Sequence, residues 1–137
     1  MRASLAVRRS RTAYAFLIAL VIALGLASRE YPDALPTVLG KYPGDGLWAL
    51  MVFLLVCFFK PRWTSGKAAL FALILSFVVE FSQLWQAPWL NALRENRLGN
   101  LVLGSEFHVA DLAAYAVGIA MGLAMELLWQ SRRSRQV

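Results

Sequence analysis

Residues that commonly build catalytic and metal sites are scarce in this sequence. One cysteine, Cys57, and one histidine, His108, occur among its 137 residues. A lone cysteine excludes an intrachain disulfide and leaves the redox compartment open. Spacings typical of zinc ligands, phosphate-binding glycine loops and serine–histidine–aspartate triads are missing too, and we interpret His108 as the neighbour of a helix start. We therefore predict no cofactor and no metal, and we lean away from an enzyme without excluding one.

Charged residues are also few, at 16% of the chain against 59% hydrophobic residues, and the mean hydropathy is +0.56. The apolar residues form blocks, each about as long as a bilayer core requires, which is roughly 20 residues. This pattern excludes an ordinary soluble domain and predicts one all-α integral membrane domain over residues 1–137. The predicted transmembrane helices cover residues 13–28, 45–59, 68–85 and 109–129.

The basic residues predict the orientation of these four spans. Ten of the 14 lysines and arginines lie in the N-terminal segment, the turn between spans two and three, and the C-terminal tail. The other two connections hold four. The positive-inside rule therefore places both termini in the cytoplasm, and it explains the isoelectric point of about 10.1 without nucleic acid.

The first span allows two interpretations. Small residues recur in it at every fourth position, which lets another helix approach closely: Ala15, Ala19, Ala23 and Ala27. The alternative is a cleaved signal peptide, because 25–27 resembles a small-x-small cleavage site. A retained span is favoured, since the run is long enough to cross a bilayer.

The segment 87–105 is longer than a connection needs. Its leucines are spaced roughly as one apolar helical face, interrupted by Gly99, while Arg94 and Arg97 suit the headgroup level. An interfacial or re-entrant helix fits this pattern, and an ordered loop with buried leucines is the alternative.

Two carboxylates stand inside the apolar patterns. Glu80 shares a helical stripe with Ser76 and Gln83 on the third span, and Asp111 shares one with Tyr115 on the fourth. An acid at membrane depth is costly and indicates function by default. We predict that these two stripes meet near the external side, although Glu80 paired with Arg29 or Arg94 is a structural alternative.

Other polar residues have plainer explanations beside the functional one. Asp45 and Asp111 suit helix starts, where carboxylates favour the helix dipole. Glu126, near the cytoplasmic end, is expected to meet Arg132, Arg133 or Lys60. The stripe of the fourth span continues through Gly118, Gly122, Met125 and Trp129, and the two glycines form a GxxxG pair predicted to pack closely against another helix.

The polar segments carry a family resemblance. The string QAPWLNALRENRLGNLVLG, followed by DLAAY at 111–115, resembles the bacterial domain-of-unknown-function family twenty-eight-oh-nine, and so do LGKY at 39–42 and GDGLWA at 44–49. More distantly, Glu80-x-x-Gln83, Asp111 and Gly118 resemble VanZ-like proteins, linked to glycopeptide tolerance, with Tyr115 in place of an expected asparagine. The resemblance implies a small inner-membrane protein of the cell envelope and supplies no reaction.

Three hypotheses about function remain open at this point. The first is binding of an envelope lipid or lipid-linked headgroup in an external polar pocket. Its candidate residues are Glu80, Gln83, Asp111, Tyr115, Asp45, Arg29, Arg94 and Arg97. The second is an enzyme acting on such a lipid, with Glu80 or Asp111 as general base. The third is an accessory subunit that binds a membrane protein partner or a second copy of the chain.

Overall fold

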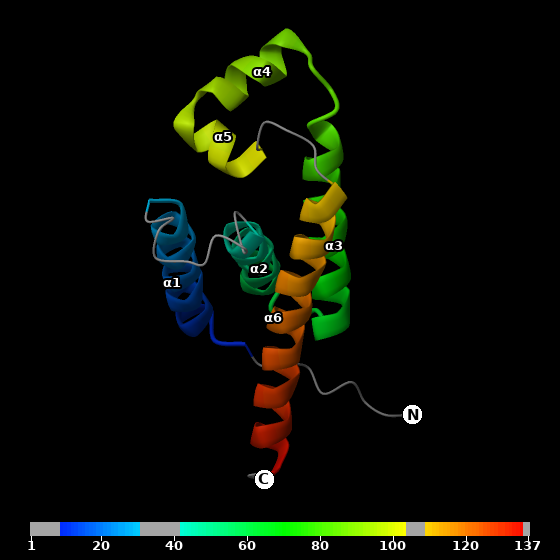
Figure 1. Cartoon of the computed structure of the whole chain (residues 1–137). Helices are drawn as coiled ribbons and strands as arrows, with labels where there is room; N and C mark the ends of the chain where they lie inside the picture. The colour runs from blue at the N-terminus through cyan, green and yellow to red at the C-terminus, as the bar shows by residue number, and fades with distance from the viewer. Residues whose placement is uncertain (1–8, 31–41, 104–108, 136–137) are drawn as a thin grey trace.

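The computed structural model describes residues 9–30, 42–103 and 109–135. Within these ranges the chain forms helices joined by short connections, and no strand occurs in them (Figure 1). The helices are α1 (Arg11–Glu30), α2 (Tyr42–Phe59), α3 (Ser65–Ser82), α4 (Pro88–Glu95), α5 (Arg97–Leu103) and α6 (Val109–Arg135). The all-α prediction is confirmed for the part of the chain that the structure describes.

The long helices have the length and composition of membrane spans. Apolar windows long enough to cross a membrane lie in α1, α3 and α6, at Arg11–Ser28, Ser65–Ser82 and Val109–Arg132. The apolar part of α2, Pro43–Phe59, is shorter. The chain therefore has the helices of a multi-pass membrane protein.

The boundaries of α3 differ from the predicted 68–85, because α3 begins and ends earlier. Thr64 caps its start, where its hydroxyl oxygen accepts a hydrogen bond from the Lys67 amide at 3.2 Å. A side-chain cap of this kind satisfies one of the amides that a helix start leaves without a partner. The basic turn after Pro61 therefore passes directly into the helix.

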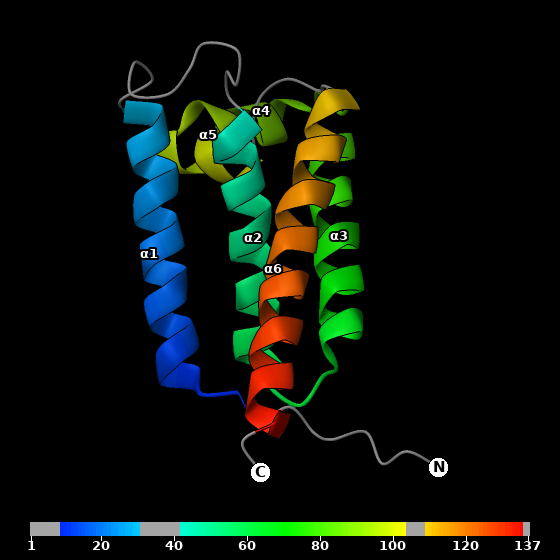
Figure 2. The same cartoon turned by 60° about the horizontal axis from the view of Figure 1, so that its bottom comes forward.

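Helix α2 is the centre of the bundle. It packs against α1 on one side and against α3 and α6 on the other, and α3 and α6 also pack against each other (Figures 1 and 2). The start of α1, the α2–α3 turn and the end of α6 lie together at one end of the bundle. Helices α4 and α5 lie at the opposite end.

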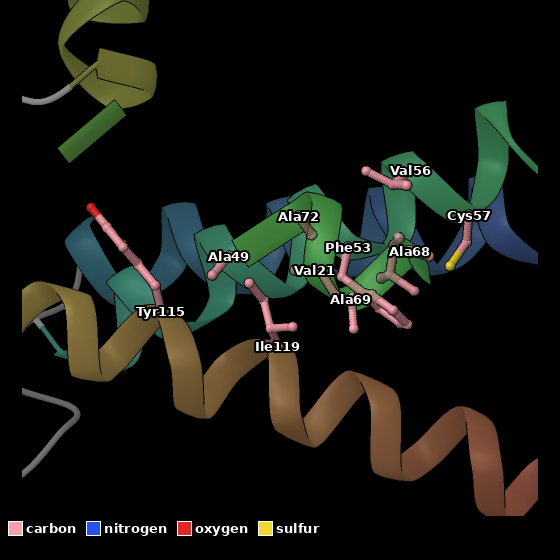
Figure 3. Close-up of a cluster of buried hydrophobic side chains, with 11 residues drawn as sticks. Val21, Ala49, Phe53, Val56, Cys57, Ala68, Ala69, Ala72, Tyr115 and Ile119 are labelled. Atoms are coloured by element: carbon pink, nitrogen blue, oxygen red, sulfur yellow. The ribbon is translucent and has the colours of Figure 1, made fainter. Parts of the chain in front are cut away.

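An apolar cluster runs along α2 between these two ends (Figure 3). Phe53 is its largest buried apolar side chain, with 1% of its surface exposed. Small residues on α3, among them Ala68 and Ala72, are completely buried and let α3 approach α2 closely. Cys57 lies at one end of the cluster and Tyr115 at the other. Each of these two residues adjoins a group of buried polar side chains.

Glycines bring α2 and α6 into close contact. The backbone of Gly118 lies against the backbone carbonyl of Gly46, with no room for a side chain on Gly118. A Cβ atom on Gly122 would lie 2.7 Å from Leu50 and 2.8 Å from Phe53. These contacts bring the backbones of α2 and α6 close together along the first half of α6.

Helices α4 and α5 occupy the segment for which an interfacial helix or an ordered loop was expected. Pro88 stands at the start of α4, where its missing amide hydrogen is not needed. The backbone of Gly99 in α5 meets the carbonyl group of Leu93 in α4 so closely that no side chain would fit on Gly99. Gly99 therefore allows the tight α4–α5 corner, although the sequence suggested that it interrupts a helix.

Candidate functional site

Glu80 on α3 and Tyr115 on α6 form the centre of a buried polar group. Glu80 has no exposed surface, and its Oε2 atom accepts a hydrogen bond of 2.8 Å from the Tyr115 hydroxyl. Ser76, one turn before Glu80, is also fully buried and donates its hydroxyl to the Ala72 carbonyl within α3. The stripes predicted on the two helices therefore face each other at this end of the bundle.

Two further carboxylates lie beside Tyr115. Asp45 is in the first turn of α2 and Asp111 is in the first turn of α6, and both are buried. Both interact electrostatically with Tyr115, as Glu80 does. The amides at a helix start favour a negative charge, which helps these two helices to hold their acids. We call Asp45, Glu80, Asp111 and Tyr115 the acid cluster.

An aromatic ring adjoins the acid cluster. Trp48, one turn after Asp45 on α2, packs against Tyr115 with 5.3 Å between the ring centroids and a tilt of 42°. Its indole Nε1 atom is buried and makes no hydrogen bond within the described ranges. Sequence reasoning missed Trp48, although its helical spacing from Asp45 places both residues on the same face.

Gln83 links the acid cluster to the helices above it. It caps the C-terminal end of α3 three residues after Glu80, is 5% exposed, and donates its side-chain amide to the Leu103 carbonyl of α5 at 2.7 Å. Its Oε1 atom is buried and accepts no hydrogen bond in the part of the chain that the structure describes. Gln83 therefore brings an additional hydrogen-bond acceptor to this end of the bundle.

Two of the candidate arginines, Arg94 and Arg97, make contacts with groups outside the acid cluster. Arg94 is buried and donates to the carbonyls of Ser82 at 2.6 Å and Trp85 at 3.0 Å, so it satisfies the end of α3. Arg97 pairs with Glu30 of α1 at 3.0 Å, and both side chains are exposed. The side chain of Arg29 and the whole of His108 lie outside the described residues.

No group of three histidine, cysteine or acidic side chains suited to a metal ion occurs within residues 9–30, 42–103 and 109–135. Aromatic and acidic side chains together make a surface that is rich in hydrogen-bond acceptors and in π-electron density.

Comparison with known proteins assigns the sequence to a family. Residues 34–119 match the family described as protein of unknown function DUF2809. The chain belongs to this family. No solved structure matches it. The matched region contains every residue of the acid cluster, together with Trp48 and Gln83, but it leaves out the first helix and the end of α6.

A second buried polar group lies at the opposite end of the bundle, and sequence reasoning missed it. Arg9 donates from Nε to Glu126 on α6 at 2.6 Å and from Nη1 to the carbonyls of Pro61 and Trp63 at 3.0 and 2.6 Å. The Arg9 and Glu126 side chains are 1% and 4% exposed. Glu126 therefore meets Arg9, which reaches it from before α1, and not Arg132 or Lys60 as expected. The side chain of Arg133, the third expected partner, lies outside the described residues.

Neighbouring side chains complete this second group. Gln130 donates to Ser65 at 2.9 Å and to Glu126 at 3.3 Å, and the Cys57 thiol lies 3.5 Å from Glu126. The buried face of α6 thus continues through Glu126 rather than through Met125 and Trp129, which are exposed. A helix rotates slightly less per residue than a straight stripe at alternating spacings of four and three assumes, so the buried face drifts along α6.

Proposed function

We propose that the protein spans a bacterial inner membrane four times, with α1, α2, α3 and α6 crossing the bilayer and both termini in the cytoplasm. The basic asymmetry of ten residues to four supports this orientation. The grouping of the start of α1, the α2–α3 turn and the end of α6 at one end of the bundle also supports it (Figure 2). Helices α4 and α5, with exposed Trp89 and Leu98, would then lie at the external interface.

Reporter fusions test this topology. A reporter that is active only in the cytoplasm should give a signal when fused after Val137, and one that is active only outside should give a signal when inserted at 35–38. The reverse pattern at both sites would show that the bundle is inverted.

We further propose that the acid cluster binds the polar headgroup of a membrane lipid or lipid-linked molecule at the external end. The observation that carries this proposal is Glu80, completely buried on a span and hydrogen-bonded to the neutral Tyr115 hydroxyl. Carboxylates at membrane depth are expensive, and two more lie beside this pair. A ligand that leaves the bilayer surface and enters between α2, α3 and α6 would use groups that are otherwise costly to keep.

Native mass spectrometry of the purified protein tests lipid binding. The parent chain should retain lipid, and the Glu80→Gln variant, which keeps the shape of the side chain but removes its charge, should lose it. Glu95→Gln is the matched control, since Glu95 is an exposed acid on α4 at the same end. Equal retention by all three proteins, or none by the parent, would contradict the proposal.

A second candidate function, binding of a membrane protein partner or a second copy of the chain, is favoured by α1. The alanine ladder at 15, 19, 23 and 27 is exposed, so the bundle itself does not use it. Such a ladder suits the close approach of another helix. Ala19→Leu should then release a copurifying partner or shift the mass of the complex, whereas Leu20→Ala, off the ladder, should not.

A further inference from the structure

We infer that the α2–α3 turn binds the phosphate group of an anionic phospholipid through the ammonium groups of Lys60 and Lys67, beside the ring of Trp63. This turn lies at the end of the bundle opposite to the acid cluster and does not depend on it (Figure 2). The site rests on the proposal that the long helices cross a bilayer, because the turn then lies at a membrane surface. We call Lys60, Trp63 and Lys67 the basic–aromatic site.

The turn brings two lysines to one aromatic ring. Lys60 follows the end of α2 and Lys67 lies in the first turn of α3, and their Nζ atoms lie 5.9 and 4.5 Å from the centroid of the Trp63 ring. The Trp63 amide closes the turn by donating to the Lys60 carbonyl at 3.1 Å. The Trp63 ring packs edge to face against Phe71 of α3, with 5.5 Å between the centroids. Because tryptophan attracts ammonium groups, this fixed ring holds both lysines at a common place.

The exposed charges at this end of the bundle are of one sign. Glu126 is the one acidic side chain that the structure describes there, and it is buried and paired with Arg9. Neither Lys60 nor Lys67 forms an ion pair with an acid in the described ranges. The exposed basic residues at this end are Arg11, Lys60, Arg62, Lys67 and Arg132. Two like charges beside one ring repel each other, and an anion bound between them offsets this repulsion.

A phosphate group complements this arrangement. The lysine ammonium group is a compact point charge with three donors, and it is a common phosphate ligand in proteins. The phosphodiester of a phospholipid carries two charged oxygen atoms, so Lys60 and Lys67 can each donate to one of them. Basic residues next to membrane spans attract anionic lipids, with a gain of about fivefold in affinity for each residue near the surface.

The surface beside the turn favours a lipid over a free anion. Leu70 and Phe71 lie three and four positions after Lys67 on α3 and are 59% and 43% exposed. Phe59, directly before Lys60, is 66% exposed. A phospholipid whose phosphate lies at the basic–aromatic site can place its acyl chains along these apolar side chains. A free phosphate ion would gain nothing from them.

The test compares two lipids that share acyl chains and differ in headgroup charge. The full chain is placed in nanodiscs with equal amounts of phosphatidylglycerol and phosphatidylcholine, released, and analysed by native mass spectrometry. We expect phosphatidylglycerol to be retained roughly tenfold better, because phosphatidylcholine has the same phosphate but no net charge. Equal retention of the two lipids, or preference for phosphatidylcholine, overturns the inference.

A pair of double variants separates the basic–aromatic site from a diffuse positive potential. Lys60→Gln with Lys67→Gln should lower retention of phosphatidylglycerol roughly twentyfold. Arg62→Gln with Arg132→Gln is the matched control, since it removes two exposed charges from the same end. These two arginines make no cation–π contact with Trp63 in the described part of the chain. Equal losses in both double variants would show that the lipid responds only to net charge, and no loss in the lysine variant would remove the site.

Thermal unfolding in detergent distinguishes the two sources of a phosphate group. Added phosphatidylglycerol should raise the melting temperature of the parent chain, and inorganic phosphate at the same concentration should not. An equal rise with inorganic phosphate would show that a free anion is the ligand and would overturn the lipid assignment.

The variant that tests the acid cluster keeps the two proposals apart. Glu80→Gln lies at the opposite end and should leave retention of phosphatidylglycerol at the turn unchanged. If Glu80→Gln releases no lipid, the proposal for the acid cluster fails while the basic–aromatic site stands. If phosphatidylglycerol is lost from Glu80→Gln but kept by the lysine variant, the basic–aromatic site fails while the acid cluster stands.

Discussion

The two ends of the bundle bury polar groups in opposite ways. At one end Glu126 faces Arg9, whose guanidinium also satisfies the carbonyls of Pro61 and Trp63. At the other end Asp45, Glu80 and Asp111 surround Tyr115, a neutral phenol. A single buried carboxylate paired with one cation usually serves the fold, whereas several buried carboxylates close together are more common at functional sites. We therefore expect substitutions of Arg9 or Glu126 to act on stability alone, and substitutions at the acid cluster to act on the proposed binding as well.

The largest effect on stability is expected at the Arg9 end. Arg9→Gln leaves Glu126 as a buried carboxylate without its partner, which typically costs about 3–5 kcal/mol in soluble interiors. The free energy of unfolding in detergent should fall accordingly. The double variant Arg9→Gln with Glu126→Gln should recover much of the loss, because no isolated charge remains. If the single and double variants have the same melting temperature as the parent, the buried Arg9–Glu126 pair does not contribute to stability as expected.

The next-largest effect on stability is expected where α2 and α6 pack closely beside the acid cluster. Gly118→Ala places a methyl group against the Gly46 backbone and should destabilise the chain by about 1–3 kcal/mol through overpacking. Gly25→Ala is the matched control, since a Cβ atom there meets nothing within 4 Å. This control should stabilise α1 by about 0.5–1 kcal/mol, because alanine is the better helix former. Thermal unfolding of the two variants in the same detergent measures the contrast, and equal shifts would contradict it.

A smaller effect on stability and a clear one on binding are expected for Tyr115→Phe. This substitution removes the hydroxyl that donates to Glu80 and should cost about 1–2 kcal/mol, since the buried acid loses a hydrogen bond. It should also lower retention of the lipid bound at the acid cluster, which substitution of Arg9 or Glu126 should not do once that protein is folded. Unchanged retention with unchanged stability would remove Tyr115 from the site.

The smallest effect is expected at the exposed ion pair between α5 and α1. Glu30 and Arg97 are 59% and 80% exposed at their side chains, so solvent screens their attraction. Glu30→Gln should change the free energy of unfolding by about 0.5 kcal/mol or less. A loss as large as that of Arg9→Gln would show that ion pairs at the two ends do not differ by burial, contrary to the comparison.

Sequence periodicity predicted the helices well because a helix in an apolar environment must be apolar over most of its length. Buried Glu80, Gln83, Asp111 and Tyr115 all belong to stripes visible in the sequence, since helical spacing alone places them on one face. The same reasoning extended the α6 stripe to Met125 and Trp129, which are exposed. Helical drift over four turns was enough to move the buried face to Glu126.

Composition and spacing by themselves determined that the chain is helical, has the helices of a multi-pass membrane protein and carries acids within its apolar segments. Tertiary structure alone decided which partners these acids meet. Arg9 and Glu126 are 117 positions apart, and no periodicity relates residues on separate helices. Trp48 lies beside the acid cluster, and Arg94 of α4 donates to carbonyls at the end of α3, for the same reason: both contacts depend on how separate helices pack. Local sequence encodes which face of a helix is buried, but only the packed bundle determines what that face meets.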